Sequence, residues 1–166
     1  MSMRRMMMAA QAAVSYSTWN PSDKHANITL SNGNMRATTT TDGGYSVRST
    51  AAISGKRYFE FELLSDLGGE VCAAGVATAS EALTKFVGET TKSAGEWYPN
   101  NTIYANNSVV ANQTDSSPGS VQRYKVCVDS ATRKFWISRE DLSYPLSCDP
   151  AAGTNPTYTF SGTDGI

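Results

Sequence analysis

The amino-acid sequence predicts an all-β protein that folds as an antiparallel β-sandwich. The segment GKRYFEFELL alternates with a period of two, as a half-buried strand does. Its apolar face would hold Phe59, Phe61 and Leu63, and its solvent face Tyr58, Glu60 and Glu62. The next segment, VCAAGV, is small and apolar on both faces, and the turn-like residues SDLGGE separate the two. Helical periodicity is nearly absent elsewhere. A strand open on one side, beside a strand covered on both, implies a second layer.

Short strands between turn residues account for the rest of the chain. Two hairpins are predicted, one closed by Asn32-Gly33 between strands 28–30 and 35–37, and one closed by DSATR between strands 123–128 and 134–137. Further strands are expected at 45–48, 96–98, 102–104, 108–110 and 158–160, with a loop over 149–157. One short helical turn is expected over 80–86, where Ser80 would cap the turn. The side chains expected inside the core are Phe59, Phe61, Val126, Val128 and Trp136.

Composition indicates a single soluble domain. The chain has 166 residues, and its apolar content of 40% is enough for one core. The 14 Lys and Arg residues nearly balance the 15 Asp and Glu residues, which argues against a nucleic-acid partner. Charged residues make up 17%, below the roughly 25% usual for soluble domains, and this suits extracellular or virion surfaces. No apolar run approaches the roughly 20 residues of a membrane span.

The cysteines and the histidine limit the chemistry of any site. Three cysteines are an odd number, which does not indicate a disulfide framework. Cys72 and Cys127 alternate with apolar residues, so we expect buried free thiols, while a bridge between them stays open. Because His25 is the single histidine, we expect no metal site of the His/Cys type and no cofactor.

The acids Glu60 and Glu62 share one strand face at about 6 to 7 Å, which is close to the carboxylate spacing of retaining glycosidases. No third acid follows, because position 64 is Leu64, and His25 alone does not support a Ser-His-Asp arrangement. We therefore predict no enzyme and no catalytic residues, with glycan cleavage as a third alternative.

A candidate binding surface runs over residues 97–112, where aromatic residues alternate with asparagines. Rings can stack on a sugar or a side chain while amides fix its orientation. The predicted ligand-binding residues are Trp97, Tyr98, Asn100, Asn101, Tyr104 and Asn106. The alternative is that Trp97 and Tyr104 belong to the core and the asparagines only form turns.

Five segments, in chain order, resemble a SPRY domain: GKRYFEFEL, VCAAGVATAS, GEWYPNNTIYANN, RYKVCVDSATRKFWI and DPAAGTNPTYTF. The residues that match the family pattern are Gly55, Lys56, Tyr58, Phe59, Glu60, Gly75, Val76, Ala77, Val126, Val128, Asp129, Phe135 and Trp136. The resemblance implies a concanavalin-like β-sandwich over residues 15–166. Residues 1–14 would form an N-terminal arm, because their apolar run is shorter than the roughly 7 to 15 residues of a signal peptide.

Two features depart from the family pattern. The residues SRED at 138–141 replace the Asn-Gly turn that usually closes the late hairpin. The chain also stops at Ile166, where members usually add a final strand, so the last strand is either missing or supplied by a neighbour. The methionines of the arm could fill a groove on another copy, which would make a homo-oligomer.

The opening TWNPSDKHANITLSNGNMRAT and the segment DPAAGTNPTYTF are most similar to SPRY domains of bacteriophage structural proteins and of bacteria. The resemblance implies a non-enzymatic binding or structural module of a phage virion or tail, which recognises a protein or the host surface through loops. Expected partners are other virion subunits or a host-surface glycan. The expected location is the virion, or else the soluble fraction of a bacterium. The second alternative is a lectin-like carbohydrate-binding module.

Overall fold

The computed structural model describes residues 16–64, 72–98, 102–112, 121–140 and 148–161. Within these ranges the chain forms strands and turns and no helix. The strands are β1 (Trp19–Lys24), β2 (Thr29–Ser31), β3 (Arg36–Thr38), β4 (Val47–Ser49), β5 (Lys56–Leu64), β6 (Cys72–Ala77), β7 (Ser93–Tyr98), β8 (Thr102–Ala105), β9 (Ser108–Asn112), β10 (Val121–Asp129), β11 (Lys134–Arg139) and β12 (Tyr158–Thr159). The predicted all-β fold class is confirmed.

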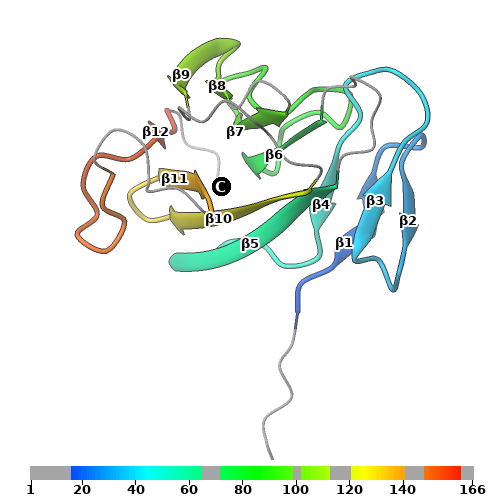
Figure 1. The fold of residues 1–166 in the computed structure, drawn as a ribbon, viewed down its shortest axis with the longest axis horizontal. Coiled ribbons are helices and arrows are strands. Elements are labelled where there is room, and N and C mark those ends of the chain that lie inside the picture. The colour runs from blue at the N-terminus through cyan, green and yellow to red at the C-terminus, as the bar shows by residue number, and fades with distance from the viewer. Residues whose placement is uncertain (1–15, 65–71, 99–101, 113–120, 141–147, 162–166) are drawn as a thin grey trace, which may run out of the picture.

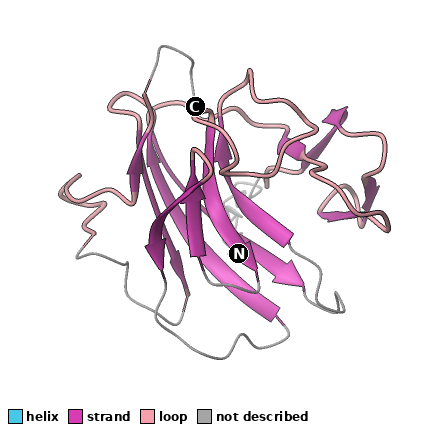
Figure 2. Cartoon of the chain, turned by 90° about the horizontal axis from the view of Figure 1, so that it is seen from above, coloured by secondary structure: helices cyan, strands magenta, loops and turns pink. Residues whose placement is uncertain are grey.

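Two four-stranded antiparallel sheets form the two layers of the fold (Figures 1 and 2). One has the strand order β12-β11-β10-β5 and the other the order β6-β7-β8-β9. Buried apolar side chains from both sheets make one core: Leu63, Tyr124, Val126, Val128, Phe135 and Ile137 from the first, and Val76, Ala94, Ile103, Ala105 and Ala111 from the second. The predicted β-sandwich is therefore confirmed.

Strand β5 carries the alternation that its sequence predicts. Leu63 is buried, and Phe59 and Phe61 pack half-buried against the core. Glu60 and Glu62 are exposed on the opposite face. A period of two is a local property of an extended backbone, so it could be read without knowing the partner strand.

The expectation that β5 and β6 are neighbours joined by a turn is wrong. β5 pairs with β10 over its whole length, from Lys56 opposite Asp129 to Leu64 opposite Val121. β6 pairs with β7 in the other sheet. The two strands therefore belong to opposite layers of the sandwich, and the residues between them lie outside the described ranges.

The expected helical turn over 80–86 is also wrong. The backbone carbonyls of Glu81, Leu83 and Lys85 accept hydrogen bonds from β4 and the residue before it, rather than from residues four positions later. The donors are the Arg48 guanidinium, the Ser46 backbone N–H and the Ser46 hydroxyl. These long-range bonds hold the segment as successive turns against β4, and no sequence pattern within 80–86 indicates them.

Two small antiparallel sheets, β1–β4 and β2–β3, lie together at one side of the sandwich (Figure 1). The predicted Asn32-Gly33 turn is present, with φ of 51° and 62° at its two residues, a backbone that these residue types adopt readily. Strand β1 was not predicted, because its sequence WNPSDK is polar and contains Pro21. Its edge position, with β4 as the partner, explains why proline is tolerated.

The three cysteines are half-buried and form no disulfide, so Cys72 and Cys127 are not bridged. Cys72 and Cys127 lie in opposite sheets. Cys72 packs on the core, and desolvation raises the pKa of its thiol.

The N-terminal arm and the residues after 161 lie outside the described ranges, so the expectations for both ends stay predictions. No helix in the described ranges has the length and apolar content needed to cross a membrane. In the same ranges, His, Cys, Asp and Glu side chains do not gather in threes at metal-binding distance.

Candidate functional site

A cleft lies on the outer face of the β12-β11-β10-β5 sheet, the face turned away from the core. The register places Tyr58 of β5, Cys127 of β10 and Trp136 of β11 side by side across this face. These three residues alternate with core residues along their strands, so the pleat directs their side chains outward. The cleft has a volume of about 260 Å³, and its lining residues are Lys56, Arg57, Tyr58, Cys127, Val128, Asp129, Trp136 and Pro150. We call it the Tyr58–Trp136 cleft.

Trp136 is buried, although it lies on the outer face rather than in the core between the sheets. Only 2% of its surface is exposed, because the segment 149–157 folds over it. The indole N–H donates to the Thr154 carbonyl at 3.0 Å, and the Lys134 ammonium donates to the Gly153 carbonyl at 2.6 Å. The expectation that Trp136 is buried is confirmed, but its assignment to the same core as Val126 is wrong. Its polar edge is occupied, so the indole offers the cleft an apolar surface.

Tyr58 forms the opposite wall of the cleft and is 56% exposed. Its hydroxyl donates to Glu60 Oε1 at 2.5 Å. This hydrogen bond, followed by desolvation and by the charge of Glu60, raises the pKa of the Tyr58 phenol to about 12. The Tyr58 phenol is neutral at physiological pH, and its hydroxyl donates its hydrogen bond to Glu60. More than half of the side chain remains exposed to solvent.

The charged residues at the rim of the cleft differ in the hydrogen bonds that they form within the protein. Asp129 Oδ1 accepts the backbone N–H groups of Ala131 at 3.1 Å and Thr132 at 3.3 Å. The side-chain hydrogen bond from Thr132, aided by these backbone donors, lowers the pKa of Asp129. Within the described residues, the Lys56 ammonium makes no hydrogen bond and no ion pair. Its charge nevertheless acts on Asp129, its register partner, and helps to lower the pKa of that carboxyl.

Further along the same face, the acids of β5 are engaged by their neighbours. Arg123 of β10 donates to the Glu62 carboxylate and, at 3.3 Å, to Glu140. Glu60 accepts the Tyr58 hydroxyl. The two glutamates that share a strand face therefore form separate contacts with different donors.

The residues that the sequence predicts as ligand-binding are only partly brought together. Trp97 and Tyr104 lie on the outer face of the other sheet, with ring centroids 4.5 Å apart, and Phe86 packs 5.4 Å from Trp97. The Trp97 indole N–H donates to the Val87 carbonyl at 2.5 Å. These contacts fix the loop 78–92 to β7 and β8.

The other predicted site residues lie apart from this cluster or outside the described structure. Asn106 is exposed in the β8–β9 turn with φ of 51°. Tyr98 ends β7, and its side chain is not described. Asn100 and Asn101 lie outside the described residues. The structure therefore supports a structural role for the Trp97–Tyr104 pair, and it leaves a ligand role for the remaining residues as a prediction.

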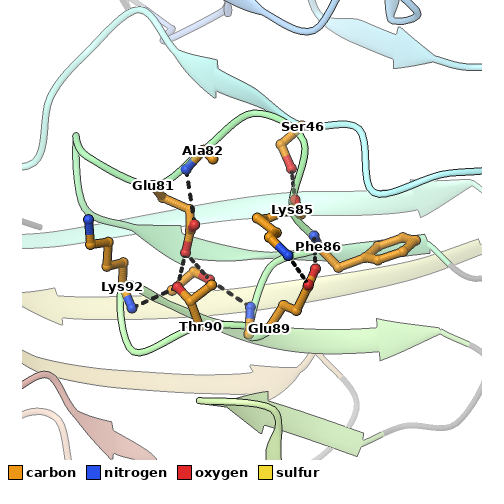
Figure 3. A network of polar contacts seen from close by, with 10 residues as sticks. Ser46, Glu81, Ala82, Lys85, Phe86, Glu89, Thr90 and Lys92 are labelled. Carbon is orange, nitrogen blue, oxygen red and sulfur yellow. Dashed lines mark hydrogen bonds and ion pairs between the residues drawn. The ribbon is translucent and has the colours of Figure 1, made fainter.

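A polar network holds the loop 78–92 in place (Figure 3). The buried carboxylate of Glu81 accepts the Thr90 hydroxyl, the Ser93 hydroxyl at 2.9 Å and the Ala82 N–H at 3.0 Å. In the same loop, Lys85 and Glu89 form an ion pair at 2.5 Å, which raises the pKa of Lys85 and lowers that of Glu89. Sequence inspection missed the burial of Glu81, because its two hydroxyl donors, Thr90 and Ser93, are nine and twelve residues away.

Two layers of antiparallel sheet, with small strand pairs at one side, define this chain as a SPRY-like β-sandwich. Among solved structures, that of stonustoxin, a protein containing a B30.2/SPRY domain, is similar, with a TM-score of 0.57 and 25% sequence identity. The match covers 77% of this chain and 22% of the stonustoxin chain, so this chain spans about a fifth of that protein. No family model and no curated protein matches the chain.

Proposed function

We propose that this chain is a non-enzymatic recognition module that binds a protein partner through the Tyr58–Trp136 cleft. The observation that carries the proposal is an aromatic ring, 56% exposed, that stands beside a concave site with an apolar floor. Interfaces concentrate their binding energy in such pockets, which an anchor side chain of the partner fills.

The size of the cleft favours a peptide over a small-molecule ligand or an oligosaccharide. Its volume of about 260 Å³ is below the roughly 300 to 1,000 Å³ of typical ligand pockets. Two of the polar groups around it, the Tyr58 hydroxyl and the Trp136 N–H, already donate within the protein. A sugar needs several free donors and acceptors, whereas an anchor side chain needs mainly apolar contact.

Selection from a random peptide library on the purified full chain tests this proposal. We expect enriched peptides whose affinity falls by roughly 30-fold in Tyr58→Ala, the loss of an anchor worth about 2 kcal/mol. The matched control is Tyr16→Ala, which removes a tyrosine that is 73% exposed and lies outside the cleft. Equal binding by both variants, or a library that yields no enriched peptide, would overturn the proposal.

A glycan array on the same protein tests the lectin-like alternative. That alternative rests on the rings of Trp97 and Tyr104 and on the exposed Asn106. Glycan binding that survives Tyr58→Ala and disappears in Trp97→Ala, with the fold intact, would replace the peptide proposal. Release of reducing sugar from a bound glycan would instead support the enzymatic alternative.

We further propose that the module belongs to a bacteriophage virion, where other virion subunits or the host surface would supply the partner. This proposal is supported by the resemblance of the opening segment and of DPAAGTNPTYTF to SPRY domains of phage structural proteins. Mass spectrometry of purified particles tests it, with the chain expected in stoichiometric amounts. Its absence from particles, with the chain abundant in the soluble fraction of the cells, would contradict a virion location.

A further inference from the structure

We infer that the Tyr58–Trp136 cleft takes an acidic peptide segment in which an aromatic side chain and a carboxylate are two positions apart. The inference rests on the proposed function and specifies the chemistry of the partner. The ring would enter the cleft between Tyr58 and Trp136, and the carboxylate would lie toward Lys56. The partner is a protein that presents this segment in extended form.

The shape and lining of the cleft favour a single planar side chain. Trp136 lies beneath the cleft with its polar edge turned to Thr154, and Pro150 adds a rigid apolar wall. Tyr58 contributes an open ring face, and aromatic rings pack well against one another at offset or edge-on angles. An aromatic anchor therefore uses the surfaces that the cleft offers, without requiring new polar partners.

The charges along β5 give the cleft a direction. Lys56, Tyr58 and Glu60 follow one another on the outer face, so a cation lies on one side of the Tyr58 ring and a carboxylate on the other. A ligand carboxylate is attracted to the Lys56 side and repelled from the Glu60 side. Arg57 also lines the cleft, but it alternates to the other face of β5, so Lys56 is the cation that this strand places on the outer face.

Asp129 is opposite Lys56 in the register and reduces this attraction only in part. Its carboxylate accepts two backbone N–H groups of the following turn and is directed to them. On the outer face, Lys56 is therefore opposite an acid that is already held by backbone donors. The site therefore complements a ligand with an acidic group.

The strand geometry sets the spacing in the ligand. Lys56 and Tyr58 are two residues apart on β5, so their side chains are about 6.5 to 7 Å apart. In an extended peptide, residues i and i+2 project from the same face with the same separation. A ring at i and a carboxylate at i+2 or i−2 can therefore reach both groups, whereas adjacent residues point to opposite faces.

Three synthetic peptides in a neutral polar host test the inference, with affinities measured by calorimetry. The first carries a tyrosine and a glutamate two positions apart, the second carries the same residues at adjacent positions, and the third carries lysine in place of glutamate. We expect the first peptide to bind roughly tenfold more tightly than the third, because an exposed attraction is replaced by a repulsion. The difference should shrink at high salt, which screens exposed charges.

Reversal of one charge in the protein supplies a stronger test. In Lys56→Glu, the lysine peptide should bind more tightly than the glutamate peptide. Arg36→Glu is the matched control, because Arg36 is exposed on β3 and does not line the cleft. It makes the same change of charge and should leave the preference unchanged.

Alkylation of Cys127 gives an independent readout of binding, because this half-buried thiol lines the cleft and Cys148 does not. The bound first peptide should slow alkylation of Cys127 and leave that of Cys148 unchanged.

The outcomes separate this inference from the proposed function. Peptides that lose affinity in Tyr58→Ala but show no preference for acid, for spacing or for the sign of residue 56 would overturn the inference and leave the recognition module standing. Binding that is unaffected by Tyr58→Ala and that leaves Cys127 freely alkylated would overturn both.

Discussion

Tyr58 and Trp136 flank Cys127 on the same face of one sheet, yet Tyr58 is 56% exposed and Trp136 only 2% exposed. The difference comes from the segment 149–157, which covers β11 and leaves β5 open. Pro150 of this segment lines the cleft together with Tyr58 and Trp136.

The two faces of β5 should respond differently to truncation. Phe61 stacks on Tyr124 with ring centroids 5.2 Å apart and packs on the core, so Phe61→Ala should cost about 2 to 3 kcal/mol. This is less than the full cost of a large-to-small core change, because Phe61 is only half-buried. Tyr58→Ala on the same strand should cost less than about 1 kcal/mol. Urea denaturation measures both, and similar losses would contradict the assignment of the faces.

The cover over Trp136 should depend on its indole N–H. Trp136→Phe removes the donor to the Thr154 carbonyl, and we expect a loss of about 1 kcal/mol. Amide exchange in 149–157 should accelerate, since opening of this segment no longer breaks that bond. Unchanged exchange in this segment, measured by mass spectrometry, would show that other contacts hold it.

Tyr58 should ionise later than an ordinary tyrosine. The Glu60 hydrogen bond raises its pKa from 10.0 to about 12, so the unfolded chain loses this proton first as pH rises. The contribution of Tyr58 to stability is therefore complete below pH 10 and is lost as pH rises toward 12. Up to about pH 11, the wild-type protein and Tyr58→Phe should show the same tyrosinate absorbance, because Tyr58 is still protonated. In Glu60→Gln, the pKa of Tyr58 should fall, so its tyrosinate absorbance should appear at lower pH. A difference already present near pH 10 would contradict the raised pKa.

The loop 78–92 should depend more on Glu81 than on Glu89. Glu81 is 8% exposed and accepts two hydroxyls and a backbone N–H, so Glu81→Ala removes the acceptor of the buried Ser93 hydroxyl and of the half-buried Thr90 hydroxyl. We expect a loss of about 2 kcal/mol and faster amide exchange through the loop. Glu89→Ala breaks a more exposed ion pair and should cost less than about 1 kcal/mol. Equal losses in thermal and urea unfolding would contradict the role of Glu81.

The candidate site shows where inspection of the sequence stops being informative. The alternation of β5 assigns Tyr58 to the outer face, but no pattern within that strand indicates that Cys127 and Trp136 lie beside it. The binding surface at 97–112 was predicted from its composition. In the structure, the rings of Trp97 and Tyr104 pack together, and Trp97 holds the loop 78–92 through the Val87 carbonyl.

The sequence by itself determined what depends on neighbouring residues. The period of two in β5 separates Phe61 from Glu62, and Asn32-Gly33 provides a turn whose positive φ values these residues tolerate. The tertiary structure decided what depends on distant partners. It placed β5 and β6 in opposite sheets, and it turned the carbonyls of 81–85 toward β4 instead of into a helix. Buried backbone N–H and C=O groups need hydrogen-bond partners, and local sequence patterns do not identify which distant strand supplies them.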